Sequence, residues 1–482
     1  MNSLKQTVYR LLRVRPAREK TITVTEPMTF RGNVMKNRIW YRGEPWELEQ
    51  FFTQAASGPP ERSRFWATAP AERVRKLHSG LVGTVVDRYR DMVTADFNGL
   101  SFGETGPDHP LADRWEAIAR DSGFRELLGR AVAGALACGD GAFKLTAAPG
   151  DVRPRLSFYE ADRVEPRYEN GRLTELRFLT PVGEPDRELR LEETYGRGYI
   201  RCRLVDGAGR ERPLSDTPET ATLRDVEFPG DFILGTPVIL LGGGRWPGRG
   251  KALFEGKTDA LDALDEVLSQ WMDGVRMGRV KRYIPEDMVP RDPDTGRVLP
   301  PDPFENDYIA VGSSRTEGAA DKIDVSQPQI AWEAYAQTYA AFLELALQGV
   351  MSPATLGADL KRTDNAEAQR EKENITLHVR GRIVDALCDI LPELAGTALM
   401  AEDLLCGRTP GRYRAAARFG EYGRPDFGTA VDTVARARAG GIMSIEQAVE
   451  ELYGDAWTPA EKAAEAERLR REQDLSPGKE IE

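Results

Sequence analysis

The hydrophobic pattern of the chain changes between helical and strand periods in separate blocks. Residues 40–56, 72–93 and 111–138 carry apolar side chains at steps of three and four, which predicts amphipathic helices. Between about 142 and 240, short alternating runs are separated by turn signals such as Glu169-Asn170-Gly171, which predicts antiparallel strands. The first half of the chain is therefore expected to be a mixed α and β body.

The strongest helical stripe begins after a glycine-rich linker at residues 242–250. A second helix is predicted over 329–350, long enough to be an antiparallel mate for the first. The segment 283–327 between them is rich in proline and polar turns, with a strand candidate at 308–311. Helix, excursion and helix are expected to form a protruding hairpin. Within residues 257–282, the apolar stripe consists of Leu261, Leu264, Leu268, Trp271, Met272 and Val275.

A long helix and a small helical unit are predicted after the hairpin. Residues 351–362 form an irregular break, and the Asp-x-x-Glu pattern at 364–367 is typical of a capping box. The helix that follows runs towards Leu405, with Pro392 as a candidate kink. Glycine and capping signals between 440 and 459 then separate further helices.

Composition and charge mainly exclude classes of protein. The chain has 482 residues, of which 30% are charged and 40% hydrophobic, so we expect a soluble protein with more than one structural unit. No apolar run approaches about 20 residues, so no membrane partner is expected. The four cysteines form no CxxC pair, which argues against a zinc ribbon. A net charge of −11 disfavours a tight grip on nucleic acid but suits a protein past which DNA slides.

The known enzyme motifs fail on spacing. Gly250-Lys251 resembles the end of a phosphate-binding loop, but Arg245 stands where that motif needs its first glycine. The three histidines are far apart, and no HExxH pattern occurs. We therefore expect no enzymatic activity, no cofactor and no metal.

The charge of the first hairpin helix reverses along its length. Its first part presents an acidic face, made of Asp259, Asp262, Glu266 and Asp273. Its end carries only bases, namely Arg276, Arg279, Lys281 and Arg282. The helix macrodipole by itself favours acids at the start and bases at the end, so a plain solvated face is the simpler alternative. A magnesium site for nucleotidyl transfer is a further alternative for the acids.

This order of elements resembles the portal proteins of tailed double-stranded DNA phages, especially the SPP1-like group. The resemblance covers nearly the whole chain. It rests on WYRGEPWELEQFF at 40–52, KLHSGLVGTVVDRYRDMV at 76–93, the hairpin at 257–350, Ser352-Pro353-x-x-Leu356-Gly357, Asn365-Ala366-Glu367-Ala368 and Gly441-Ile442-Met443-Ser444.

The resemblance implies a portal fold with a mixed α/β wing, a two-helix stem, a small α/β clip and a helical crown. In chain order it implies an N-terminal arm at 1–25, the wing at 26–256, a first stem helix at 257–282, the clip at 283–327, a second stem helix at 328–350, a tunnel loop at 351–362, a long wing helix and returning strand at 363–428, and the crown at 429–482.

The resemblance also implies a function and a set of partners. Portals are ring-shaped channels, typically dodecamers, that sit at the capsid vertex of the virion and assemble in the host cytoplasm. Implied partners are further copies of the chain, passing double-stranded DNA, the terminase large subunit, a head-tail adaptor, and the major capsid and scaffold proteins. The alternatives are another capsid-associated structural protein, which would not form closed rings, and a magnesium-dependent nucleic-acid enzyme.

Three groups of residues receive roles from this reading. The acidic stem face would repel DNA and let it slide, and the bases near the clip would serve docking of the motor and adaptors. The tunnel loop would face DNA through Val350, Met351, Ser352, Thr355, Leu356, Lys361 and Arg362.

Overall fold

The computed structural model of the protein describes most of the chain in separate segments. These are residues 28–55, 65–68, 74–103, 110–183, 188–285, 288–299, 308–312, 324–357, 366–420, 427–454, 457 and 459–474. Long helices and largely antiparallel sheets occupy different parts of the chain, so the predicted α+β class is confirmed. In the part of the chain described, no helix is long and apolar enough to cross a lipid bilayer.

Short helices make up the N-terminal part of the described chain. They are α2 (Phe30–Arg42), α3 (Pro45–Ala55), α4 (Leu81–Ala95), α5 (Pro110–Asp121) and α6 (Phe124–Cys138). The hydrophobic pattern predicts one helix in each of three blocks, so the helical character is confirmed but the boundaries are wrong. Glycines in the left-handed region cause the difference: Gly43 (φ 76°) ends α2, and Gly80 (63°) and Gly123 (61°) precede α4 and α6.

Two antiparallel sheets follow these helices. The smaller one has the order β10-β2-β3, from β2 (Gly141–Thr146), β3 (Arg155–Glu160) and β10 (Gly235–Val238). The larger one runs β4-β5-β6-β7-β8, with β9 paired to β7. Its strands are β4 (Val164–Glu169), β5 (Arg172–Val182), β6 (Leu189–Gly196), β7 (Tyr199–Val205), β8 (Glu211–Arg212) and β9 (Val226–Glu227).

The predicted hairpin turn between β4 and β5 is confirmed. Asn170 and Gly171 both take positive φ values, 50° and 77°, which is the geometry that a two-residue hairpin with the right strand twist requires. The pairing of β4 to β5 brings Val164 opposite Phe178, and β5 to β6 brings Leu176 opposite Tyr195. These side chains form a small core of their own.

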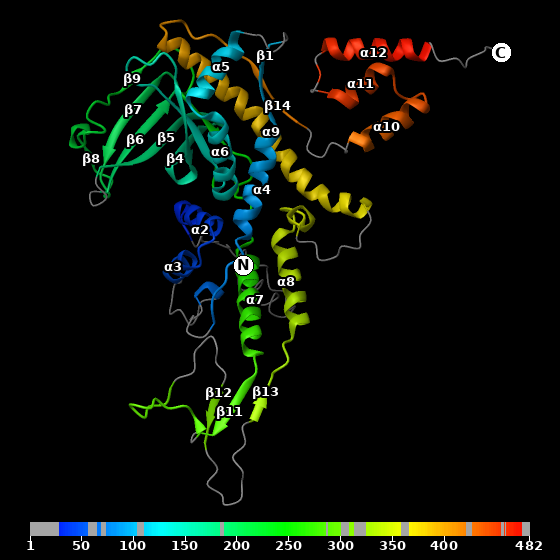
Figure 1. Cartoon of the computed structure of the whole chain (residues 1–482). Helices are drawn as coiled ribbons and strands as arrows, with labels where there is room; N and C mark the ends of the chain where they lie inside the picture. The colour runs from blue at the N-terminus through cyan, green and yellow to red at the C-terminus, as the bar shows by residue number, and fades with distance from the viewer. Residues whose placement is uncertain are drawn as a thin grey trace, which may run out of the picture.

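A helical hairpin projects from the part of the molecule that holds these sheets (Figure 1). Its two helices are α7 (Thr258–Met277) and α8 (Trp332–Leu347). At its far end lie β11 (Lys281–Pro285), β12 (Tyr308–Val311) and β13 (Asp324–Ser326), in the order β12-β11-β13. The predicted helix, excursion and helix are confirmed, as is the strand at 308–311. We call this unit the hairpin and the remaining elements up to β14 the body.

Among the described residues after the hairpin, the regular elements are helices and one strand. The helix α9 (Ala366–Leu405) continues through Pro392, and β14 (Ala415–Phe419) pairs antiparallel with β1 (Phe97–Phe102). The C-terminal helices are α10 (Phe427–Ala439), α11 (Ile445–Tyr453) and α12 (Pro459–Asp474). The Ser444 hydroxyl accepts the N–H of Gln447 at 3.2 Å, so the predicted helix start there is confirmed.

One hydrophobic core joins the base of the hairpin to the body. Tyr89 of α4, Phe143 of β2 and Ile383 of α9 are fully buried in it. Leu264 from α7 and Leu347 from α8 belong to the same core. Because both hairpin helices end in this core, the hairpin is rooted in the body at two points.

A second junction precedes α7, where the chain leaves the sheets. The guanidinium of Arg249 lies 4.0 Å from the ring centre of Phe30, 2.9 Å from the Asp140 carboxylate, and donates to the Val164 carbonyl at 2.7 Å. The N–H of Gly250 donates to the other Asp140 oxygen at 2.9 Å. A buried charge pair with these added hydrogen bonds holds the linker against the sheets.

We predict that Gly250→Ala destabilises the protein by about 1–3 kcal/mol, the usual cost of overpacking. A Cβ at position 250 would collide with the backbone carbonyl oxygen of Gly139, so the backbone itself would have to shift. A thermal melt of both variants measures the effect, with Gly242→Ala as control because a Cβ there meets no atom within 4 Å. Equal melting temperatures for the two variants would contradict the close approach.

Candidate functional site: the helical hairpin and the loop at its base

Aromatic side chains hold the two hairpin helices together. The rings of Trp271 and Tyr335 stack, with their centroids 6.3 Å apart and an interplanar angle of 9°. The Tyr339 ring lies 6.5 Å from that of Trp271. Gly274 makes room for this, since a Cβ there would lie only 3.1 Å from the Tyr335 ring. Near the base, the Lys257 ammonium donates to the carbonyl of Leu345 at 2.9 Å. The predicted apolar stripe therefore faces the core at Leu261 and Leu264 and faces α8 at Trp271. Its last two residues, Met272 and Val275, are exposed.

The four residues of the predicted acidic face differ in their burial. Asp259 is exposed, and Glu266 and Asp273 are half-buried. Asp262, by contrast, is only 6% exposed, and its carboxylate accepts the N–H groups of Trp66 at 2.6 Å and Ala67 at 3.1 Å. The prediction that Asp262 belongs to a solvent-facing wall is wrong, because this carboxylate is used to bind backbone.

Further polar side chains of α7 fasten the segment before α4. Asp265 accepts the N–H of Ser79 at 2.9 Å and contacts the Nδ1 atom of His78 at 2.5 Å. The Ser269 hydroxyl accepts the N–H of Leu77 at 2.9 Å. A chain without regular pairing needs such acceptors for its buried N–H groups, so α7 positions residues 65–68 and 77–79 along its side.

Sequence reasoning missed this role, although a signal was present. Asp262, Asp265 and Ser269 lie next to Leu261, Leu264 and Leu268 and therefore on or beside the buried stripe of the helix. A buried polar side chain needs a hydrogen-bond partner. Acids inside an apolar stripe thus indicate that another segment packs there, but they do not identify which one.

The basic end of the first hairpin helix is divided between a helix and a strand. The helix stops at Met277, where Gly278 packs against the side chain of Ile330 so closely that a Cβ would collide with it. The prediction of one helix through residue 282 is therefore wrong. Arg276 lies in the last turn of α7, Arg279 follows the helix, and Lys281 and Arg282 belong to β11.

The loop at the base of the hairpin is too buried for its predicted contact with DNA. Val350, Met351 and Ser352 are 3%, 1% and 2% exposed, so the prediction that these three face DNA is wrong for this conformation of the chain. Thr355 and Leu356 are half-buried. Lys361 and Arg362 lie outside the described residues.

Long-range hydrogen bonds bury this loop. The Tyr89 hydroxyl donates to the Val350 carbonyl at 2.6 Å, and the N–H of Ser352 donates to the Thr376 hydroxyl of α9 at 2.9 Å. The Thr355 hydroxyl lies 3.0 Å from the same Thr376 oxygen. Ser352 also caps a short 3₁₀ helix, η7 (Pro353–Leu356). The loop is therefore an ordered junction between α4, α8 and α9.

The described residues offer no arrangement for a metal ion. No group of three or more His, Cys, Asp or Glu side chains in this part of the chain is placed to hold one. Two of the acids near the start of α7, Asp262 and Asp265, already bind backbone N–H groups. Of the three acids that the magnesium alternative would use, Asp259, Asp262 and Glu266, the second is therefore already bound to backbone.

Comparison with known proteins finds likenesses to solved structures at low sequence identity. No family model and no curated protein matches the sequence. A chain in the neck of an empty GTA particle is 16% identical, covering 75% of this chain and 87% of that one, with a TM-score of 0.42. A chain in the neck of the native GTA particle is 15% identical over 80% of this chain and 90% of that one, with a TM-score of 0.38.

A third similar chain comes from the virion of a native gene transfer agent particle. It is 14% identical, covering 86% of this chain and 96% of that one, with a TM-score of 0.39. Sequence identities and TM-scores this low assign no function to this chain.

We predict that the carboxyl of Asp262 makes stability depend on pH. Burial raises its pKa to about 6, from the ordinary value of 3.8. The folded protein therefore holds a proton that the unfolded chain has lost between these two values, so this group lowers stability as pH rises through that window. Asp262→Asn removes this pH dependence. The melting temperature of the variant, relative to that of the native protein, should therefore be higher at pH 7 than at pH 4.

Melting temperatures of both proteins at the two pH values measure this difference. Asp273→Asn serves as control, since its carboxylate lies on the outer side of the same helix and is half-buried. If the difference between Asp262→Asn and the native protein were the same at both pH values, the burial of this carboxyl would be contradicted.

Proposed function

We propose that the protein is the subunit of a ring-shaped portal in a tailed phage or phage-like particle, a structural channel for double-stranded DNA. In this proposal the body is the wing, α7 and α8 are the stem, β11–β13 form the clip and α10–α12 the crown. The observation that carries the proposal is the position of exposed apolar side chains. Among the described residues, twelve of the twenty large apolar side chains that stay exposed lie between 272 and 345.

Eleven of these side chains lie on the half of the hairpin that leaves the body, and Leu345 lies near its base. Met272, Val275 and Met277 on α7 are 42–52% exposed, Trp332 on α8 is 60% exposed, and Val325 on β13 is 58% exposed. A soluble monomer rarely concentrates apolar surface in this way. Identical hairpins standing side by side would cover each other's apolar side chains, and a head-to-tail contact repeated with rotation closes into a ring.

The charge of the stem supports a channel for DNA. Asp259, Glu266 and Asp273 remain accessible on α7, and repeated around a ring they would form an acidic belt. DNA carries one negative charge per about 1.7 Å of its axis, so a basic lining would bind it and obstruct movement. An acidic belt keeps the duplex sliding.

Contacts with DNA and with partner proteins follow from the remaining candidate residues. Because residues 350–352 are buried, we assign the tunnel-loop contacts with DNA to Thr355, Leu356, Lys361 and Arg362. The bases at the clip end, Arg276, Arg279, Lys281 and Arg282, would dock the terminase large subunit during packaging and the head-tail adaptor afterwards. Location at the capsid vertex, with capsid and scaffold proteins around it, belongs to the same proposal.

We predict that the purified chain forms closed oligomers with a mass of many times 53.6 kDa, and that Met272→Glu with Val275→Glu abolishes them. Two carboxylates placed in an apolar contact would remain charged without partners. Light scattering after size-exclusion chromatography measures the mass. Val152→Glu is the control, because that side chain is 60% exposed on the body. A native chain that stays monomeric, or oligomers that tolerate both carboxylates, would contradict the proposal.

A further inference from the structure

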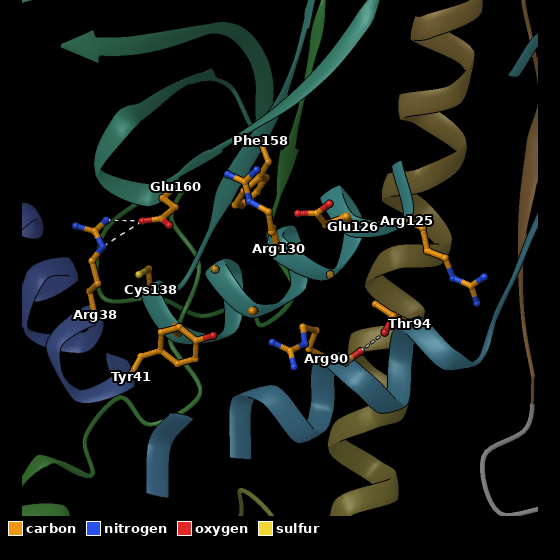
Figure 2. A pocket seen from close by; sticks show the side chains of 14 residues that line it. Arg38, Tyr41, Arg90, Thr94, Arg125, Glu126, Arg130, Cys138, Phe158 and Glu160 are labelled. Carbon is orange, nitrogen blue, oxygen red and sulfur yellow. Dashed lines mark hydrogen bonds and ion pairs between the residues drawn. The ribbon is translucent and has the colours of Figure 1, made fainter. Parts of the chain in front are cut away.

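A groove opens on the body at a place that the proposed channel does not use. It is a cavity of about 680 Å³ between α2, α4, α6 and β3 (Figure 2). Its floor is the side of α6 that carries Gly129, Ala133 and Ala137, while Thr94 of α4 and Phe158 of β3 stand on its walls. Small residues along a helix leave space for another chain to approach closely.

The rim of this groove is predominantly basic. Four arginines line it, against two glutamates. Arg38 is paired with Glu160 at 2.7 Å, and Arg90 with Asp87 at 2.8 Å. Arg125 and Arg130, both exposed, meet no acidic partner among the described residues.

The arginines approach the groove from different elements. In Figure 2, Arg130 projects from α6 beside Phe158, Arg90 stands on α4 below it, and Arg125, also on α6, points away from these side chains. Arg125 and Arg130 supply two positive charges that no described acid pairs, against the one negative charge of the exposed Glu126 on the same rim, so the rim attracts carboxylates. The groove therefore favours an acidic partner.

An acidic surface, opposite in charge to the groove, lies elsewhere on the same chain. Residues 214–231, which we call the acidic lobe, contain a single base, Arg224. Val226, 45% exposed, lies in the middle of the lobe and offers an apolar contact. The lobe exposes five acids, namely Asp216, Glu219, Asp225, Glu227 and Asp231.

The lobe and the groove lie on different flanks of the body. The lobe includes β9, which pairs with β7 near one end of the large sheet. The other end is β4, which η3 (Ala161–Arg163) connects to β3 at the groove. Strands are about 4.8 Å apart, so β7 and β4 are separated by roughly 14 Å across the sheet. Figure 1 shows β9 and α4 on opposite sides of the sheet.

We propose that the acidic lobe of one copy docks into the basic groove of the next copy. This inference rests on the proposed ring, because a head-to-tail contact needs two different surfaces on each subunit. The carboxylates of the lobe meet Arg125 and Arg130, and Val226 packs towards the small residues of the floor. The contact adds a body-to-body interface to that of the hairpins, and it weakens as salt screens the charges.

Charge exchange between the two surfaces tests this contact. The groove variant carries Arg125→Glu and Arg130→Glu, and the lobe variant carries Asp216→Arg and Glu227→Arg, at positions without an acidic or basic partner among the described residues. Each variant alone should reduce the ring fraction at 0.1 M salt by about tenfold or more, because like charges then face each other across the contact. A chain with all four substitutions should regain rings, because attraction is restored with the signs exchanged.

A matched control changes the charge by the same amount elsewhere. Arg120→Glu with Arg172→Glu reverses two exposed arginines outside the groove and should leave rings unchanged. Rings that tolerate the groove and lobe variants would overturn this inference, and so would failure of the four-substitution chain to recover. Absence of rings from the native chain would instead overturn the proposed function, so the two failures are distinguishable.

Discussion

The structure depends on the way α7 and α8 are rooted in the body. Leu261 and Leu264 enter the main core from α7, and Leu347 enters it from α8. Beside this apolar contact, α7 uses Asp262 and Asp265 to bind backbone N–H groups of the segment before α4. Apolar burial sets the depth of the helices, and the hydrogen bonds fix the rotation of α7 about its own axis.

This rooting has a direct consequence for the opposite half of the hairpin. Because the base is held rigidly, the far half projects from the body and exposes Met272, Val275 and Trp332. The strands β11–β13 at its far end are few and short, and a three-stranded sheet covers little of its own apolar surface. In the proposed ring, neighbouring copies would provide the missing contacts and would bring the groove of one body next to the acidic lobe of another.

The periodicity of the sequence predicted which parts of the chain are helix, strand or turn, but side-chain roles depended on distant partners. The hairpin, the Asn170-Gly171 turn and the α+β class could be predicted because each arises from local spacing. The boundaries at Gly43 and Gly80 were missed, since a glycine inside an amphipathic pattern does not reveal its φ. The roles of Asp262 and Met351 were wrong because their partners, Trp66 and the main core, are far away in the sequence.

Imaging of the purified full-length chain by electron microscopy tests the central claim most directly, namely that hairpins of neighbouring copies stand side by side around a channel. The account predicts closed rings with an axial hole in end views, and in side views a narrower projection formed by the hairpins below a wider body. Single particles of one chain, open filaments, or rings in which the hairpins point outward from the rim would contradict it.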